Sequence, residues 1–89
     1  MPNTFTAPAH VIVQTIGDEM VFFHTTEGRY LTLDAVGARV YTLLLECGRD
    51  GTCARLVEEF QGDEATINAD VAALIDQLVA AGLIEPGAS

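Results

Sequence analysis

The feature that most constrains this chain is a change in the spacing of its apolar residues just after Leu33. Before this point, apolar and β-branched residues form short runs and in places alternate with polar residues. After it, apolar residues recur about every 3.6 positions. The first spacing is typical of strands and the second of amphipathic helices. The sequence therefore predicts an α+β fold in which a sheet comes first and helices follow.

Three β-rich segments are expected before the change in spacing. Residues 10–16 and 19–24 flank Gly17-Asp18, whose composition suits a two-residue hairpin turn. A second reversal at residues 25–28 leads into the short segment 29–33. Consecutive strands joined by short turns usually pair as neighbours, so we expect a three-stranded antiparallel sheet whose last strand forms an edge.

Three helices are expected after the sheet, because three apolar stripes follow one another and each is bounded by a capping residue and a glycine. Gly37 is the one glycine that falls inside a predicted helix, and close packing against a neighbouring element is its plain explanation. The predicted caps are Asp34, Thr52 and a residue between Asp63 and Thr66, and the predicted ends lie before Gly48, near Gly62 and at Gly82.

One domain accounts for most of the chain, since 89 residues can bury one modest core. Residues 1–9 contain two prolines and no apolar period, so we expect a flexible N-terminal arm. The predicted domain spans residues 10–85, and a short tail follows at residues 86–89.

The charge of the chain narrows the classes of partner. Thirteen acidic residues against four basic ones give a net charge of −9, which repels a phosphate backbone, so nucleic acid is not an expected partner. No apolar run approaches the roughly 20 residues of a membrane span, and no signal-peptide pattern opens the chain. We therefore expect a cytoplasmic protein without membrane contact, whose charge serves solubility or the steering of a positively charged partner.

Residues that could serve catalysis or metal binding form no recognisable pattern. Cys47 and Cys53 fall on the apolar sides of predicted helices, and His10 and His24 fall on the two strands of one hairpin. A two-Cys, two-His metal site would need all four to converge without a close-spaced pair of ligands, so we interpret them as packing and strand residues. The sequence predicts a protein that is not an enzyme and needs no cofactor.

The region from Glu27 to Tyr41 resembles the signature of PqqD-like proteins, also called RiPP recognition elements. Tyr41 stands where the family usually has tryptophan, and Asp34 where asparagine is common; both are mild changes for packing and capping. Further segments resemble the family's hairpin and its last helix, namely residues 17–23, 69–71 and 78–84.

The resemblance implies both a fold and a function. The family fold is a three-stranded antiparallel sheet followed by three helices, similar to a winged helix-turn-helix, and its members bind precursor peptides. This chain would then bind the leader segment of a ribosomally made precursor peptide and deliver it to a modifying enzyme or leader protease. It looks more similar to members paired with lasso-peptide leader proteases than to the pyrroloquinoline quinone carrier.

The predicted mode of binding is strand addition, in which a peptide pairs with the unpaired edge of the third strand. The resemblance places the groove between the third strand and the third helix. Leu74 and Leu78 also belong to the core stripe of that helix, and alternation leaves open which face of the strand meets the ligand. The candidate peptide-binding residues are Arg29, Tyr30, Leu31, Thr32, Leu33, Asp70, Leu74, Gln77 and Leu78.

Two other functions are weighed against peptide binding. A winged-helix nucleic-acid-binding or transcription-regulatory domain is compatible with the order of elements, although the charge argues against it. A small thiol-redox enzyme would need a Cys-x-x-Cys motif, which the chain lacks. The unpaired edge can also join two copies into a homodimer.

Overall fold

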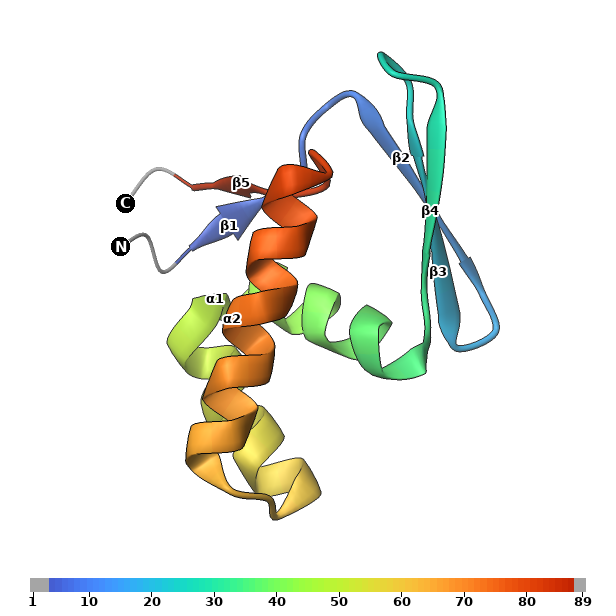
Figure 1. Cartoon of the computed structure of the whole chain (residues 1–89). Helices are drawn as coiled ribbons and strands as arrows, with labels where there is room; N and C mark the ends of the chain where they lie inside the picture. Colours follow the sequence, from blue (N-terminus) through green and yellow to red (C-terminus); the bar gives the residue numbers. More distant parts are fainter. Residues whose placement is uncertain (1–3, 88–89) are drawn as a thin grey trace.

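In the computed structural model, which describes residues 4–87, a three-stranded sheet stands beside two helices and a small two-stranded sheet (Figure 1). The strands β2, β3 and β4 pair antiparallel in that order, so β4 lies at an edge. The predicted α+β class and the three-stranded antiparallel sheet are confirmed. The order of elements is β1 (Phe5–Thr6), β2 (Val11–Ile16), β3 (Glu19–His24), β4 (Arg29–Leu33), α1 (Ala35–Phe60), α2 (Glu64–Ala80) and β5 (Glu85–Pro86).

Alternation along the strands gives the sheet an inner and an outer face. On the inner face, Phe22 and His24 of β3 are buried, and the ring of Phe22 packs edge-on against Tyr41 of α1 with centroids 4.8 Å apart. The outer face carries Phe23 and Tyr30, and in Figure 1 both helices lie on the other side of the sheet. The sheet therefore contributes to the core with one face only.

The helical part contains two helices, so the prediction of three is wrong. Within α1, Gly48 has φ 73° and ψ −174°, which is not helical, and the helix bends at this residue (Figure 1). Thr52 was predicted to cap a separate helix, but it lies inside α1, where its hydroxyl donates to the Gly48 carbonyl at 2.6 Å. A glycine followed by a threonine can mark a new helix or a kink that the threonine bridges, and the pattern alone does not distinguish them.

The other helix boundaries lie where the sequence predicts them. The carboxylate of Asp34 accepts a hydrogen bond from the Gly37 amide at 2.8 Å, and that of Asp63 accepts one from the Thr66 amide at 3.2 Å. Beyond α2, Gly82 has a positive φ of 74°, the left-handed conformation that commonly ends a helix. The finer comparison with a winged helix-turn-helix stays a prediction.

The short strands β1 and β5 pair with each other and close the structure near the two ends of the described chain. The side chain of Phe5 is buried and belongs to the hydrophobic core. The sequence predicts a flexible arm at residues 1–9 and a tail at residues 86–89, so each of these strands includes residues expected to be loose. Strands of two residues are too short to produce a periodic pattern. Residues 1–3 and 88–89 lie outside the described part.

The core joins the inner face of the sheet to both helices. Tyr41 is 1% exposed, and its hydroxyl donates to the Leu83 carbonyl at 3.3 Å. Cys47 and Cys53 are free thiols packed against this core, as the sequence predicts. Burial also raises the pKa of Cys53, which keeps its thiol in the less reactive protonated form.

Candidate functional site

The edge strand β4 has a hydrogen-bonded neighbour on one side only. It pairs with β3 along its whole length, and no other strand within residues 4–87 pairs with it. In an antiparallel ladder, alternate residues point both backbone groups away from the neighbour. The five residues of β4 therefore offer roughly four to six N–H and C=O groups along a vacant edge.

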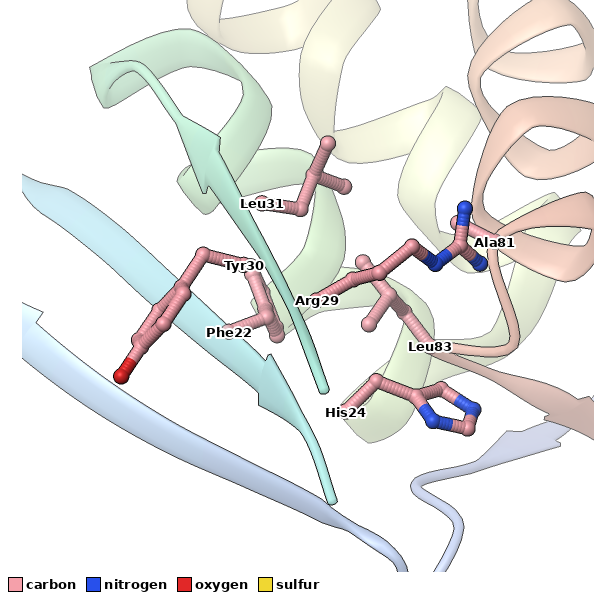
Figure 2. Close-up of a pocket in the computed structure, with 7 residues that line it drawn as sticks. All are labelled: Phe22, His24, Arg29, Tyr30, Leu31, Ala81 and Leu83. Atoms are coloured by element: carbon pink, nitrogen blue, oxygen red, sulfur yellow. The ribbon is translucent and has the colours of Figure 1, made fainter. Parts of the chain in front are cut away.

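The side chains of β4 divide between the two faces of the sheet (Figure 2). Arg29 and Leu31 point toward the helices, whereas Tyr30 points away from them and is 73% exposed. The ring of Tyr30 packs against Phe23 of the neighbouring strand, with centroids 4.7 Å apart. The odd-numbered residues of β4 therefore face the helices, and the even-numbered ones face outward.

A small pocket of about 50 Å³ lies at the start of β4, between the sheet and the end of α2 (Figure 2). The guanidinium group of Arg29 extends toward Ala81 on the far wall. An ion pair of 2.8 Å with Glu27 holds this guanidinium group in place. The pocket is lined by Phe22, His24, Arg29, Tyr30, Leu31, Ala81 and Leu83.

His24 connects this end of the sheet to the end of α2. Its Nδ1 accepts a hydrogen bond from the Glu27 amide at 3.2 Å, and its ring centroid lies 4.5 Å from that of His10. A Cβ atom at Gly82 would lie 2.9 Å from the His24 Nε2. The glycine therefore serves two purposes, because it permits both the left-handed turn and the close approach of the histidine.

A larger, mostly apolar pocket of about 210 Å³ lies beyond the other end of β4, between the two halves of α1 and the first half of α2. Val36 and Phe60, 58% and 56% exposed, are its most exposed apolar residues, and Asp70 is its one charged lining residue. We call this the helical pocket. It is lined by Val36, Gly37, Val40, Leu56, Phe60, Ile67, Asp70, Val71 and Leu74.

Two contacts hold the walls of the helical pocket in position. A Cβ atom at Gly37 would lie 3.3 Å from the side chain of Leu33, so this glycine packs closely against the end of β4. An ion pair of 2.6 Å joins Arg39 in the first half of α1 to Glu59 in the second half. The hydrogen bond from Arg39 lowers the pKa of Glu59, so the carboxylate stays ionised as the pH falls toward its ordinary range.

The structure brings some of the predicted site residues together and separates others. Asp70 and Leu74 line the helical pocket, whereas Gln77 is exposed on α2 and lines neither pocket. Leu78 is 1% exposed and belongs to the core. Val36 and Phe60 are not among the residues predicted for the site. Their helical spacing predicted burial in the core, but the structure leaves them exposed at the mouth of the helical pocket.

Two further features bear on the class of protein. No helix within the described residues has the length and apolar character that crossing a bilayer requires. In residues 4–87, no three His, Cys, Asp or Glu side chains converge in an arrangement that could hold a metal ion.

Fold and site together define a small α+β domain with a vacant sheet edge that has a pocket near each of its ends. The family described as coenzyme PQQ synthesis protein D (PqqD) matches residues 19–84, which is most of the chain. The protein therefore belongs to the PqqD family, and the membership predicted from the sequence is confirmed.

Solved structures extend the similarity to nearly the whole chain. TbiB1 in complex with the TbiA(beta) leader peptide is 29% identical, with a TM-score of 0.85 over 94% of this chain and 99% of that one. A lasso peptide synthetase B1 complexed with its leader peptide is 23% identical, with a TM-score of 0.84 over 92% of this chain and 98% of that one, and this likeness shows the fold alone. No curated protein sequence matches the chain.

Proposed function

We propose that this protein binds the leader segment of a ribosomally made precursor peptide by strand addition to β4. It then delivers the peptide to a modifying enzyme or leader protease, in a pathway of the lasso-peptide type. The observation that carries the proposal is the vacant edge of β4, which has a pocket near each of its ends. Membership of the PqqD family and the similarity to TbiB1, whose structure holds a leader peptide, support it.

Backbone pairing explains part of the binding energy. Roughly four to six hydrogen bonds to β4, each contributing about 0.5–1.5 kcal/mol net, would give a few kcal/mol. Ordering a disordered peptide costs about 2–5 kcal/mol, so backbone pairing alone would bind weakly and would not discriminate between sequences. Side-chain contacts must supply the remaining affinity and the specificity.

The helical pocket is suited to that role. Burying one Leu or Phe side chain contributes about 1.5–3 kcal/mol, which offsets much of the ordering cost. An apolar leader residue would contact Val36, Phe60 and Leu74 at this pocket, while Asp70 would pair with a basic residue beside it. Along the strand, the backbone of Arg29 to Leu33 would hold the peptide.

The remaining predicted residues have supporting positions in this arrangement. Leu31 would line the small pocket at the start of β4, and Leu33 and Leu78 would hold the strand and α2 in position from within. Gln77 would meet the peptide only where it passes along the exposed side of α2. Tyr30 and Thr32 would lie beside outward-pointing side chains of the added strand.

The proposed role is that of a non-catalytic, cytoplasmic binding protein. The competing role in nucleic-acid binding gains no support, because a net charge of −9 opposes contact with phosphates. TbiB1, which the chain resembles, is instead in complex with a leader peptide.

The test is a titration of the purified protein with the leader peptide encoded in the same gene neighbourhood, using a scrambled leader as the control. We expect a dissociation constant below about 100 μM for the leader and no binding of the scrambled sequence. If the leader does not bind below that concentration, the proposed function is wrong.

A pair of proline variants tests the docking strand. Thr32→Pro should abolish leader binding, because proline disrupts strand pairing at β4. The matched variant, Gln14→Pro, disrupts the opposite edge strand, β2, and should leave binding intact. Equal loss in both variants would contradict docking at β4.

A further inference from the structure

Neither helix covers the outer face of the three-stranded sheet (Figure 1). This face carries an apolar patch. The register places Ile12 beside Phe23, and Phe23 beside Tyr30, in one row across the three strands. Ile12, Ile16 and Tyr30 are 58%, 59% and 73% exposed. We call the following residues the outer patch: Ile12, Ile16, Val21, Phe23 and Tyr30.

We propose that the outer patch is the surface on which the enzyme that acts on the bound peptide docks. The identity of the partner rests on the proposed function, whereas the location rests on the patch itself. An exposed apolar surface that includes aromatic side chains is typical of a protein–protein contact.

Strand addition makes the outer patch continuous with the bound peptide. A strand that pairs with β4 continues the sheet, so every second side chain of the peptide lies on the outer face. These side chains come to lie beside Tyr30 and Thr32, which are the outward-facing residues of β4. An enzyme docked on the outer face therefore contacts the protein and its peptide together, and it can distinguish the loaded form from the free form.

The charges around the outer patch determine which kind of surface fits it. Glu19 pairs with Ile16 and is exposed at one end of the patch, whereas Asp18 of the adjoining turn lines a pocket on the helix side together with Arg39. No arginine lies on the outer face, because Arg29 points toward the helices and the other three belong to α1. The chain contains no lysine, since all four basic residues are arginines. The complementary surface is apolar with basic residues at its rim, and a second copy with a net charge of −9 does not match it.

The test measures binding of the enzyme encoded with the precursor to the immobilised protein, with and without saturating leader peptide. The variant Ile12→Ser/Ile16→Ser removes the two most exposed aliphatic residues of the patch without touching β4. Val79→Ser, a change of an apolar residue 42% exposed on α2, is the matched control. Circular dichroism melting and leader affinity are measured for every variant.

We expect the patch variant to bind the enzyme at least tenfold more weakly, while its leader affinity stays within twofold of the wild type and Val79→Ser changes neither. Leader peptide should strengthen enzyme binding to the wild type. Glu19→Lys should also weaken enzyme binding and reduce its dependence on salt.

Three results separate the explanations. Unchanged enzyme binding by the patch variant overturns the docking surface. A wild type that sediments as a dimer beside a monomeric patch variant also overturns it, because the patch then joins two copies. If no form binds the leader but the patch variant still loses the enzyme, the docking surface stands and the peptide-binding role falls.

Discussion

Strand addition at β4 predicts a specific response to single N-methyl groups along the leader peptide. Each N-methyl group removes one backbone donor and places a methyl group in the hydrogen-bonding edge. Because β4 has five residues, two or three of them present a carbonyl to the peptide, so two or three peptide N–H groups should be sensitive. The sensitive positions should be two residues apart.

The expected size follows from the loss of one hydrogen bond. The net contribution of a backbone hydrogen bond is about 0.5–1.5 kcal/mol, which corresponds to roughly a two- to thirteen-fold increase in the dissociation constant. Steric conflict between the methyl group and β4 adds to this at each sensitive position. At the intervening positions the N–H points away from β4, and the affinity should stay close to that of the unmodified peptide.

Fluorescence anisotropy with a set of singly N-methylated leaders measures this pattern directly. The internal control is each tolerant neighbour, which carries the same chemical change one residue away. Loss of affinity at consecutive positions, or uniform tolerance along the peptide, would show that the leader does not bind as a strand. The reasoning from the vacant edge would then be wrong even if the leader binds.

Further predictions concern stability. Gly82→Ala should lower the free energy of unfolding by more than the roughly 1 kcal/mol expected for strained φ alone, because its Cβ would lie 2.9 Å from His24 Nε2. The control is Gly28→Ala, where φ is +68° and no atom lies within 4 Å of the added Cβ. Urea unfolding of this control should show only the cost of the strained backbone. Tyr41→Phe should cost about 0.5–1.5 kcal/mol by removing the donor to the Leu83 carbonyl. Burial raises the pKa of Tyr41 above its ordinary value near 10, so wild-type stability should fall as the pH rises through that value, and the phenylalanine variant should lose that part of the fall. Arg39 lowers the pKa of Glu59, so the stability contributed by this pair should be present above the ordinary carboxyl pKa range and lost as the pH falls through the lowered pKa. In melting curves recorded at a series of acidic pH values, Glu59→Gln should show less of this loss of stability.

The sheet and most helix boundaries could be predicted from the sequence because each has a local cause. Gly17-Asp18 sets the first hairpin, Asp34 and Asp63 provide the side-chain acceptors for two helix starts, and Gly82 permits the left-handed turn at the end of α2. Such signals act over a few residues and do not depend on the rest of the fold.

Other features could not be predicted from short-range signals alone. Gly48 and Thr52 resemble the end of one helix and the cap of another, and only the structure shows that the helix resumes after Gly48 and that Thr52 bonds back to the Gly48 carbonyl. Phe5 is held by β5 and the core, from the far end of the sequence. Val36 and Phe60 follow a helical spacing that indicates burial, yet the bend in α1 leaves them at the mouth of a pocket.

The vacant edge that would serve peptide binding also exposes the protein to pairing with itself, and its charge helps to separate the two outcomes. Two copies joined through β4 would bring two net charges of −9 together, which opposes association over the Debye length of about 10 Å at 0.1 M salt. A leader with basic residues would meet no such opposition and would gain from contact with Asp70, which lines the helical pocket. The acidic composition would therefore suppress the homodimer by repulsion and leave the edge of β4 available for a positively charged extended peptide.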